Sequence, residues 1–208
     1  MKLLQRTLII FSILFTCSHP IWGEETEEGT KQAIEAPSPD GQFAFRYTGE
    51  SDEEKQTYDL IDRKSEKVLM SVAESEPDLG PSARFNITVL WRPDSKAFAL
   101  TALLWKRGTT LSVFLRDGAT FREVKLPDLE AEIPEKVTKG KSFPHVAGLN
   151  SQSAERWQKD GSLVVEIETM VDGNGESLTA TRTVVLGFDR SDKAKVLKST
   201  MKFVTEKQ

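Results

Sequence analysis

Histidine and cysteine, the side chains most often used for acid-base and nucleophilic chemistry near neutral pH, are scarce in this chain of 208 residues, which has two histidines and one cysteine. His145 is the only histidine that remains after removal of the predicted signal peptide, residues 1–23. A serine hydrolase would therefore have to use His145, with Ser142, Ser151 or Ser153 as its nucleophile. None of these serines stands in a Gly-x-Ser-x-Gly elbow. We therefore interpret His145 as a surface or capping residue. It is kept as a candidate for binding, and no catalytic residue is predicted.

Metal ligands are equally few. The single cysteine, Cys17, leaves no set of nitrogen and sulfur ligands for zinc. Asp172, Asn174 and Glu176 place three oxygen-bearing side chains at alternate positions with glycines between them, as calcium loops do. The same residues make a good hairpin turn, which is the interpretation we favour. No cofactor and no metal site beyond this calcium candidate are predicted.

Carboxylates are abundant, with 32 acidic against 28 basic residues and a net charge of −4. This balance gives no support for nucleic acid or an anionic membrane as a partner. A glycan hydrolase could use two of these carboxylates, but such a pair is defined by its separation in space, and the sequence selects none.

The first residues are typical of a secretory signal, with Lys2 and Arg6 before an apolar core and a small residue, Gly23, at its end. We predict a signal peptide over residues 1–23 and a periplasmic or secreted protein. The apolar run is too short to span a bilayer, and no transmembrane segment is predicted. An alternative makes Cys17 the acylated residue of a lipoprotein. Residues 24–37 are acidic and lack periodicity, which predicts a disordered leader.

The strands and turns that must position the candidate residues belong to a sequence repeat with about three copies. Each unit has a turn, an alternating apolar strand, a second strand closed by Asp, and a third strand. The turns lie at residues 38–41, 92–95 and 158–161. The proline, aspartate and glycine at these sites are typical of type I turns, so we interpret their aspartates as turn formers.

Apolar and polar residues alternate along most of the chain, which predicts strands with one buried face. We predict a single, mainly β domain over residues 38–208, built from antiparallel sheets. One stretch, Asp128 to Val137, has apolar residues every four positions and predicts a short helix limited by Pro134. It lies in a stretch, 126–157, that interrupts the repeat as an insertion.

Residues 91–99 and 38–45 resemble the start of the blade repeat of TolB-type β-propellers, in which a Trp-Ser-Pro-Asp-Gly-like turn precedes an apolar strand. The third copy, at Asp160, lacks the proline. This resemblance implies blade-like meander units. A propeller needs at least about four blades to close, so three units imply a sandwich or a partial propeller.

Three tryptophans follow the signal peptide. We expect Trp91 in the repeat core. Trp105 and Trp157 are candidates for binding a sugar or a protein partner. With His145, they complete the predicted binding residues.

The sequence favours an exported, non-enzymatic β-domain that binds a protein or an envelope component. A carboxylate-based glycan hydrolase and a self-assembling structural subunit, as a homo-oligomer, are the alternatives.

Overall fold

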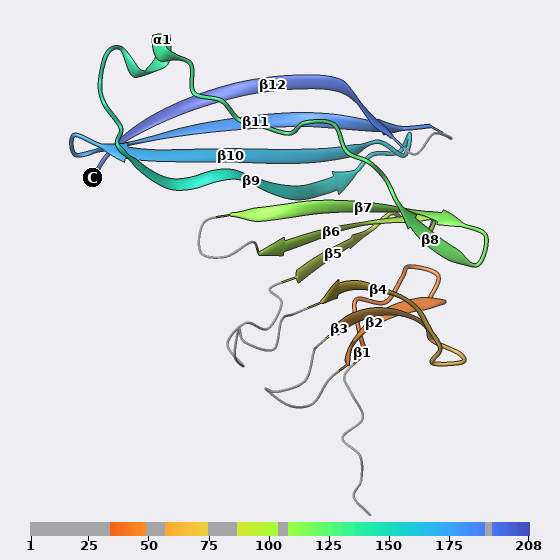
Figure 1. The fold of residues 1–208 in the computed structure, drawn as a ribbon. Helices are drawn as coiled ribbons and strands as arrows, with labels where there is room; N and C mark the ends of the chain where they lie inside the picture. The colour runs from red at the N-terminus through yellow and green to blue at the C-terminus, as the bar shows by residue number, and fades with distance from the viewer. Residues whose placement is uncertain (1–33, 49–56, 75–86, 104–107, 190–192) are drawn as a thin grey trace, which may run out of the picture. The chain divides into compact units, whose positions relative to one another are not determined.

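The computed structural model describes residues 34–48, 57–74, 87–103, 108–189 and 193–208. Residues 32–208 form one compact unit. The predicted signal peptide, the lipoprotein candidate Cys17 and the binding candidate Trp105 lie outside the described residues. Within them, twelve strands form three antiparallel four-stranded sheets (Figure 1). The predicted mainly β class is confirmed, and the described strands close no barrel or propeller ring.

Each sheet is a meander of four consecutive strands. Sheet 1 contains β1 (Ile34–Glu35), β2 (Phe43–Thr48), β3 (Thr57–Asp62) and β4 (Val68–Glu74). Sheet 2 contains β5 (Ile87–Trp91), β6 (Ala97–Leu103), β7 (Thr109–Asp117) and β8 (Thr120–Glu123). Sheet 3 contains β9 (His145–Trp157), β10 (Leu163–Gly173), β11 (Glu176–Phe188) and β12 (Ala194–Lys207).

The three predicted turns follow the first strand of each sheet and share one geometry. In each turn an aspartate accepts a hydrogen bond of 3.0 Å from the backbone N–H two residues later; these are Asp40, Asp94 and Asp160. The residue after the aspartate has a left-handed backbone, with φ of 72° at Gly41, 57° at Ser95 and 83° at Gly161. The aspartates are therefore turn formers, as predicted, and they repeat in structure as well as in sequence.

The helix predicted over Asp128 to Val137 was wrong in extent. Helix α1 covers only Glu135–Thr138, after Pro134 in an extended conformation. The residues before it are extended, with Leu129 and Ala131 buried. A spacing of four is compatible with both a helix and a strand, because four is also a multiple of two.

The boundaries of the leader and the insertion also differ from the prediction. Ile34–Glu35, expected in the disordered leader, pairs with β2. Residues 145–157, expected within the insertion, form β9, the first strand of the third sheet. The chain between β8 and β9 is therefore the true interruption of the repeat. Strand β9 was not predicted, because register shifts along its pairing with β10 interrupt the regular alternation of buried and exposed residues.

Sheets 1 and 2 enclose an aromatic core. Its buried members are Phe43, Phe45, Tyr58, Leu60, Phe98, Leu100, Phe114 and Phe121. Trp91 packs against this core from the end of β5, with ring centroids 5.0 Å from Phe98 and 5.7 Å from Phe121. The prediction that Trp91 is a core residue is confirmed.

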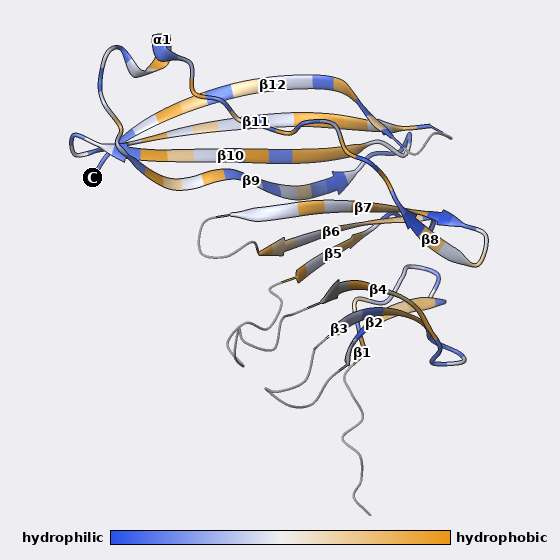
Figure 2. Ribbon diagram, in the orientation of Figure 1, coloured by the Kyte–Doolittle hydropathy of each residue, from blue (hydrophilic) through white to orange (hydrophobic). Residues whose placement is uncertain are grey.

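Sheets 2 and 3 enclose an aliphatic core. Its buried members are Ala99, Leu111, Val113, Leu129, Ala131, Leu163, Val165, Ile167, Ala180, Val184 and Leu186. From β10, Leu163, Val165 and Ile167 supply this core, and Figure 2 shows the hydrophobic stretches along this strand. Two of its members, Leu129 and Ala131, come from the chain between β8 and β9. That segment is therefore part of the packed interior.

An equivalent tryptophan hydrogen bond connects sheet 2 to sheet 1 and sheet 3 to sheet 2. The Trp91 indole Nε1–H donates to the Ala36 carbonyl at 2.8 Å, and the Trp157 Nε1–H donates to the Leu90 carbonyl at 3.0 Å. Each donor lies three residues before its turn aspartate, and each acceptor lies four residues before the turn aspartate of the preceding unit. In the first unit the donor position is Pro37, which cannot make this bond.

Candidate functional site

The predicted binding residue Trp157 is engaged within the fold. Besides its bond to Leu90, its ring lies 5.6 Å from that of Phe188. The Arg92 guanidinium lies 5.7 Å from its centroid, within the range of a cation–π contact. The structure therefore gives Trp157 a packing role between sheets 2 and 3. Trp105, the other candidate, lies outside the described residues.

His145 is exposed at the start of β9, where it is paired in register with Asp172. Two of the serines considered with it, Ser151 and Ser153, have other partners. The Ser151 hydroxyl hydrogen-bonds with that of Thr109 at 2.9 Å, and the Ser153 hydroxyl donates to Glu155 at 2.7 Å. The structure does not bring these hydroxyls to His145 as a catalytic pair.

The calcium candidate is the hairpin between β10 and β11. Asn174 and Gly175 both have positive φ, 55° and 71°, as a two-residue type I′ turn requires. The Asn174 amide donates to the Ser142 carbonyl at 2.6 Å. The candidate ligands Asp172 and Glu176 bond to Ser177 and to Lys141. Among the described residues, no group of three His, Cys, Asp or Glu is placed to hold a metal ion.

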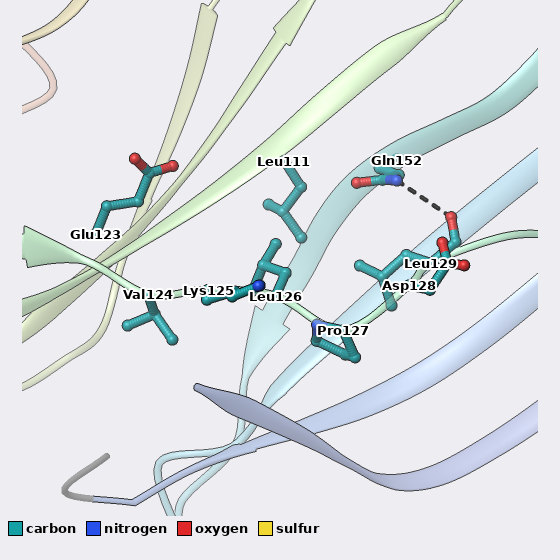
Figure 3. A pocket seen from close by; sticks show the side chains of 9 residues that line it. All are labelled: Leu111, Glu123, Val124, Lys125, Leu126, Pro127, Asp128, Leu129 and Gln152. Atoms are coloured by element: carbon teal, nitrogen blue, oxygen red, sulfur yellow. Dashed lines mark hydrogen bonds between the residues drawn. The ribbon is translucent and has the colours of Figure 1, made fainter. Parts of the chain in front are cut away.

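A groove of about 530 Å³ lies where the chain leaves sheet 2 for sheet 3 (Figure 3). Its lining consists of Leu111, Glu123, Val124, Lys125, Leu126, Pro127, Asp128, Leu129 and Gln152. The Gln152 amide donates to the Leu129 carbonyl at 3.2 Å and holds the segment in place. Figure 3 shows the carboxylates of Glu123 and Asp128 toward opposite ends of the groove.

Backbone bonds on both sides fix this segment. The Val124 N–H donates to the Val113 carbonyl at 2.8 Å, which continues the pairing of β8 with β7. The Ala194 N–H donates to the Lys125 carbonyl at 3.0 Å at the start of β12. The segment thus joins sheet 2 to sheet 3 along one side of the aliphatic core.

Beyond the groove, the same segment presents carboxylates to the inner side of sheet 3. Asp128, Glu130 and Glu132 line a hollow of about 380 Å³ together with Arg182 and Met201. The Arg182 guanidinium donates to the Glu130 carbonyl at 2.9 Å. All three carboxylates come from one short segment between β8 and α1, whereas a glycosidase needs its two carboxylates on either side of the scissile bond.

Strand β12 is the most exposed of the long strands that the structure describes. It is the edge of sheet 3, pairs only with β11 among the described strands, and extends for 14 residues. Every residue from Lys195 to Lys202 is exposed, so β12 is open to solvent on both faces of the sheet along this stretch. The bulge between Val196 and Lys198 leaves Leu197 62 % exposed. Such an edge offers a row of backbone N–H and C=O groups to another strand.

The opposite edge of sheet 3, β9, is bonded in its second half by side chains of sheet 2. The Thr109 hydroxyl donates to the Gln152 carbonyl at 2.6 Å, and the Ala154 N–H donates to the Thr101 hydroxyl at 3.2 Å. These bonds satisfy two of the backbone groups that an edge strand would otherwise present. The two edges of one sheet therefore differ, and β12 is the open one.

Comparison with known proteins assigns no family to the chain. No family model matches the chain, and no curated protein matches it. Within the part of the chain that the structure describes, no helix is both long and apolar enough to cross a membrane.

Proposed function

We propose that the chain is an exported, non-enzymatic domain that binds an extended segment of a partner protein along β12. The observation that carries this proposal is the open edge of sheet 3. A peptide that adds a strand there gains main-chain hydrogen bonds over the length of the edge, and its alternate side chains provide specificity. Export is supported by the signal-like residues 1–23, and the TolB-like repeat supports an envelope location by resemblance alone.

The charge of the edge favours an acidic partner segment. Strand β12 carries four lysines and one glutamate; these are Lys195, Lys198, Lys202, Lys207 and Glu206. Lysines on an edge disfavour pairing with an apolar strand or with a second basic strand. A cross-strand pair of opposite charges is stabilising. The proposed partner is thus a protein segment that alternates acidic with apolar residues.

Site-specific photo-crosslinking tests this function. A benzophenone amino acid replaces Ser199 on β12 or, as the control, Lys159 in the third turn, and the processed protein is exposed to envelope extract. We expect an adduct from position 199 that maps to one extended acidic segment, and none from position 159. In Lys198→Glu the yield should fall, whereas Lys159→Glu should leave it unchanged. Equal adducts from both positions, or none, would contradict the proposal.

A glycan hydrolase is a second candidate, favoured by the two carboxylates at opposite ends of the 530 Å³ groove, Glu123 and Asp128. One observation weighs against it, because the Glu123 carboxylate already accepts a hydrogen bond of 2.8 Å from Ser112. Release of reducing sugars from purified cell-wall glycans tests it. Hydrolysis by the wild type that is lost in Glu123→Gln and in Asp128→Asn would support this alternative over the binding function.

A further inference from the structure

The backbone of β12 determines which of its residues another strand can reach. The Gln208 N–H donates to the Gly175 carbonyl at 3.0 Å, on the side of β11. Successive residues of an antiparallel strand direct their backbone groups alternately to its two sides. From Lys198 to Lys207 the pairing with β11 has no register shift, so this alternation is regular. The residues whose N–H and C=O groups point to the free edge are therefore Ser199, Met201, Phe203, Thr205 and Lys207.

The charged side chains in the second half of β12 are arranged symmetrically about Val204. Phe203 is paired with the core residue Ala180 and lies on the inner face of sheet 3, so its neighbour Val204 lies on the outer face. Lys202 and Glu206 share that outer face, two residues before and two residues after Val204. An identical strand that runs in the opposite direction through this point therefore meets a lysine with a glutamate on each side.

We propose that a second copy of this chain adds its β12 to this edge, antiparallel, with a two-fold axis at Val204. Lys202 then faces Glu206 of the second copy, and the symmetry forms this pair twice. Val204 faces Val204 of the second copy between the two pairs. About eight main-chain hydrogen bonds join the residues that point to the free edge. The two four-stranded sheets become one continuous sheet.

The inner face fits the same register. Lys207 of the second copy faces Met201, which lines the acidic hollow of about 380 Å³ described above. The cation of this hollow, Arg182, donates to the Glu130 carbonyl and to the Ser199 hydroxyl, which are both neutral. The three carboxylates of the hollow thus outnumber its single guanidinium. The second copy contributes a lysine at the place where negative charge is in excess.

Other registers of two β12 strands are less favourable, because the strand is basic overall. The bulge before Lys198 ends the regular pairing on that side. A two-fold axis at Thr200 sets Lys198 against Lys202 twice. One at Lys202 pairs Lys198 with Glu206 but sets Lys202 against itself. Axes at inner-face residues such as Phe203 bring no opposite charges together. Among these registers, the proposed one alone pairs opposite charges without setting like charges against each other.

This dimer uses the edge proposed for the partner segment, but it needs no partner protein to form. It covers residues 200–208 and leaves Lys198 outside the contact. A segment that adds along the whole of β12 must displace the second copy. Self-pairing therefore keeps the edge closed until the partner is present; this consequence rests on the proposed function, whereas the dimer itself does not.

Sedimentation equilibrium of the processed protein tests the charge pairs. The wild type should show a reversible monomer–dimer equilibrium. Lys202→Glu and Glu206→Lys each turn both cross-strand pairs into like-charged ones and should raise the dissociation constant at least about tenfold. The double variant exchanges the two charges and should return to within about threefold of the wild type. Lys198→Glu, outside the contact, should leave the dissociation constant unchanged.

Disulfide formation tests the register. Val204→Cys places two cysteines opposite each other at a non-hydrogen-bonded position, where Cα atoms lie about 4.5 Å apart, within the range of a disulfide. Thr200→Cys is the matched control, because it faces Gln208 of the second copy. Without residues 1–23 the chain has no cysteine of its own, since its single cysteine is Cys17. A mild oxidant should link Val204→Cys into a covalent dimer and leave Thr200→Cys monomeric.

Each result decides the matter. A wild type that stays monomeric at about 500 μM overturns the dimer, as do unchanged dissociation constants in both single charge variants. A double variant that associates as weakly as the single ones, or equal cross-linking of the two cysteine variants, overturns the register. Circular dichroism verifies that each variant is folded. Lys198→Glu should lose the partner adduct but keep the dimer, so failure of this proposal is distinguished from failure of the proposed function.

Discussion

The two inter-sheet cores are joined by the same device but filled with different chemistry. Between sheets 1 and 2, the Trp91 indole bonds to the preceding unit and packs among aromatic rings. Between sheets 2 and 3, the Trp157 indole makes the equivalent bond, and the interior is aliphatic. The repeat therefore fixes the backbone link between sheets, whereas the side chains that fill the space between them vary freely.

A second difference lies in how the cores are bounded. The aliphatic core incorporates Leu129 and Ala131, which belong to no sheet. The segment that brings them also bonds to Val113 and Ala194 on either side. An added segment can thus replace part of a sheet face and leave a groove beside it.

Truncation of a central ring should produce the largest effect. Phe98 is fully buried and lies within 5.2 Å of the rings of Phe45, Trp91, Phe114 and Phe121. Phe98→Ala should lower the free energy of unfolding by about 3–5 kcal/mol. Leu186→Ala, equally buried in the aliphatic core, should cost about 2–4 kcal/mol, because no ring contacts are lost. Urea denaturation measures both, and a smaller loss for Phe98→Ala would reverse the ranking of the two cores.

Loss of either tryptophan hydrogen bond should lower the free energy of unfolding by an amount of the same order. Trp91→Phe and Trp157→Phe each keep an aromatic ring but leave a carbonyl, of Ala36 or Leu90, without its donor. Each should cost about 1–3 kcal/mol, and Trp91→Phe should cost more because its ring has more aromatic neighbours. Thermal unfolding compares them. If Trp157→Phe is neutral, the link is not shared by the two interfaces.

The turn of unit 2 differs from the other two at Ser95, which is fully buried with φ of 57° where they have glycine. Its hydroxyl accepts a hydrogen bond of 3.0 Å from the Asp40 N–H and so joins two turns. Ser95→Ala should cost about 1 kcal/mol, since the bond is lost and the backbone stays left-handed. Ser95→Gly should cost less, because glycine adopts this backbone without strain. Equal losses in chemical denaturation would show that the hydroxyl bond is the only contribution.

The turn aspartates should give the smallest effect, seen as a change in how the free energy of unfolding depends on pH. Hydrogen bonds from the Ser162 hydroxyl and N–H lower the pKa of Asp160. At Asp94, partial burial opposes the shift, but bonds from Arg92 and the Lys96 N–H still lower its pKa. A folded-state pKa below the unfolded one stabilises the fold above the unfolded value, and that contribution disappears as the pH falls through the folded value.

Stability should therefore decline below about pH 4, the region in which unfolded aspartates take up protons. Asp160→Asn and Asp94→Asn should each flatten that decline, because each variant lacks the contribution present at neutral pH and differs little from the wild type in acid. Urea midpoints recorded from neutral pH to acid measure the slope. A slope unchanged in both variants would show that the turns contribute nothing to the acid sensitivity.

Local features were predictable from the sequence, and topological ones were not. The three turns were found because Asp40, Asp94 and Asp160 act on backbone groups only two residues away. The helix over Asp128 to Val137 was mispredicted because the spacing of its apolar residues also fits a strand, and only the burial of Ala131 distinguishes the two.

The candidate site was beyond prediction for a different reason. Nothing in the alternating residues of β12 indicates that it lies at an open edge, since edge position depends on which strands neighbour it. Trp157 was predicted to bind a partner, and its hydrogen bond to the Leu90 carbonyl was not predicted, because Leu90 lies in a different unit of the repeat. Its position three residues before a turn aspartate, shared with Trp91, was the signal that could have revealed it.

The most direct test of the shared link is a nuclear Overhauser measurement on isotope-labelled, processed protein. The account predicts that the Trp91 indole N–H lies close to the Ala36 backbone and the Trp157 indole N–H close to the Leu90 backbone, with both protons slow to exchange. Indole protons that exchange as fast as in a free peptide and show no contacts to these residues would contradict it.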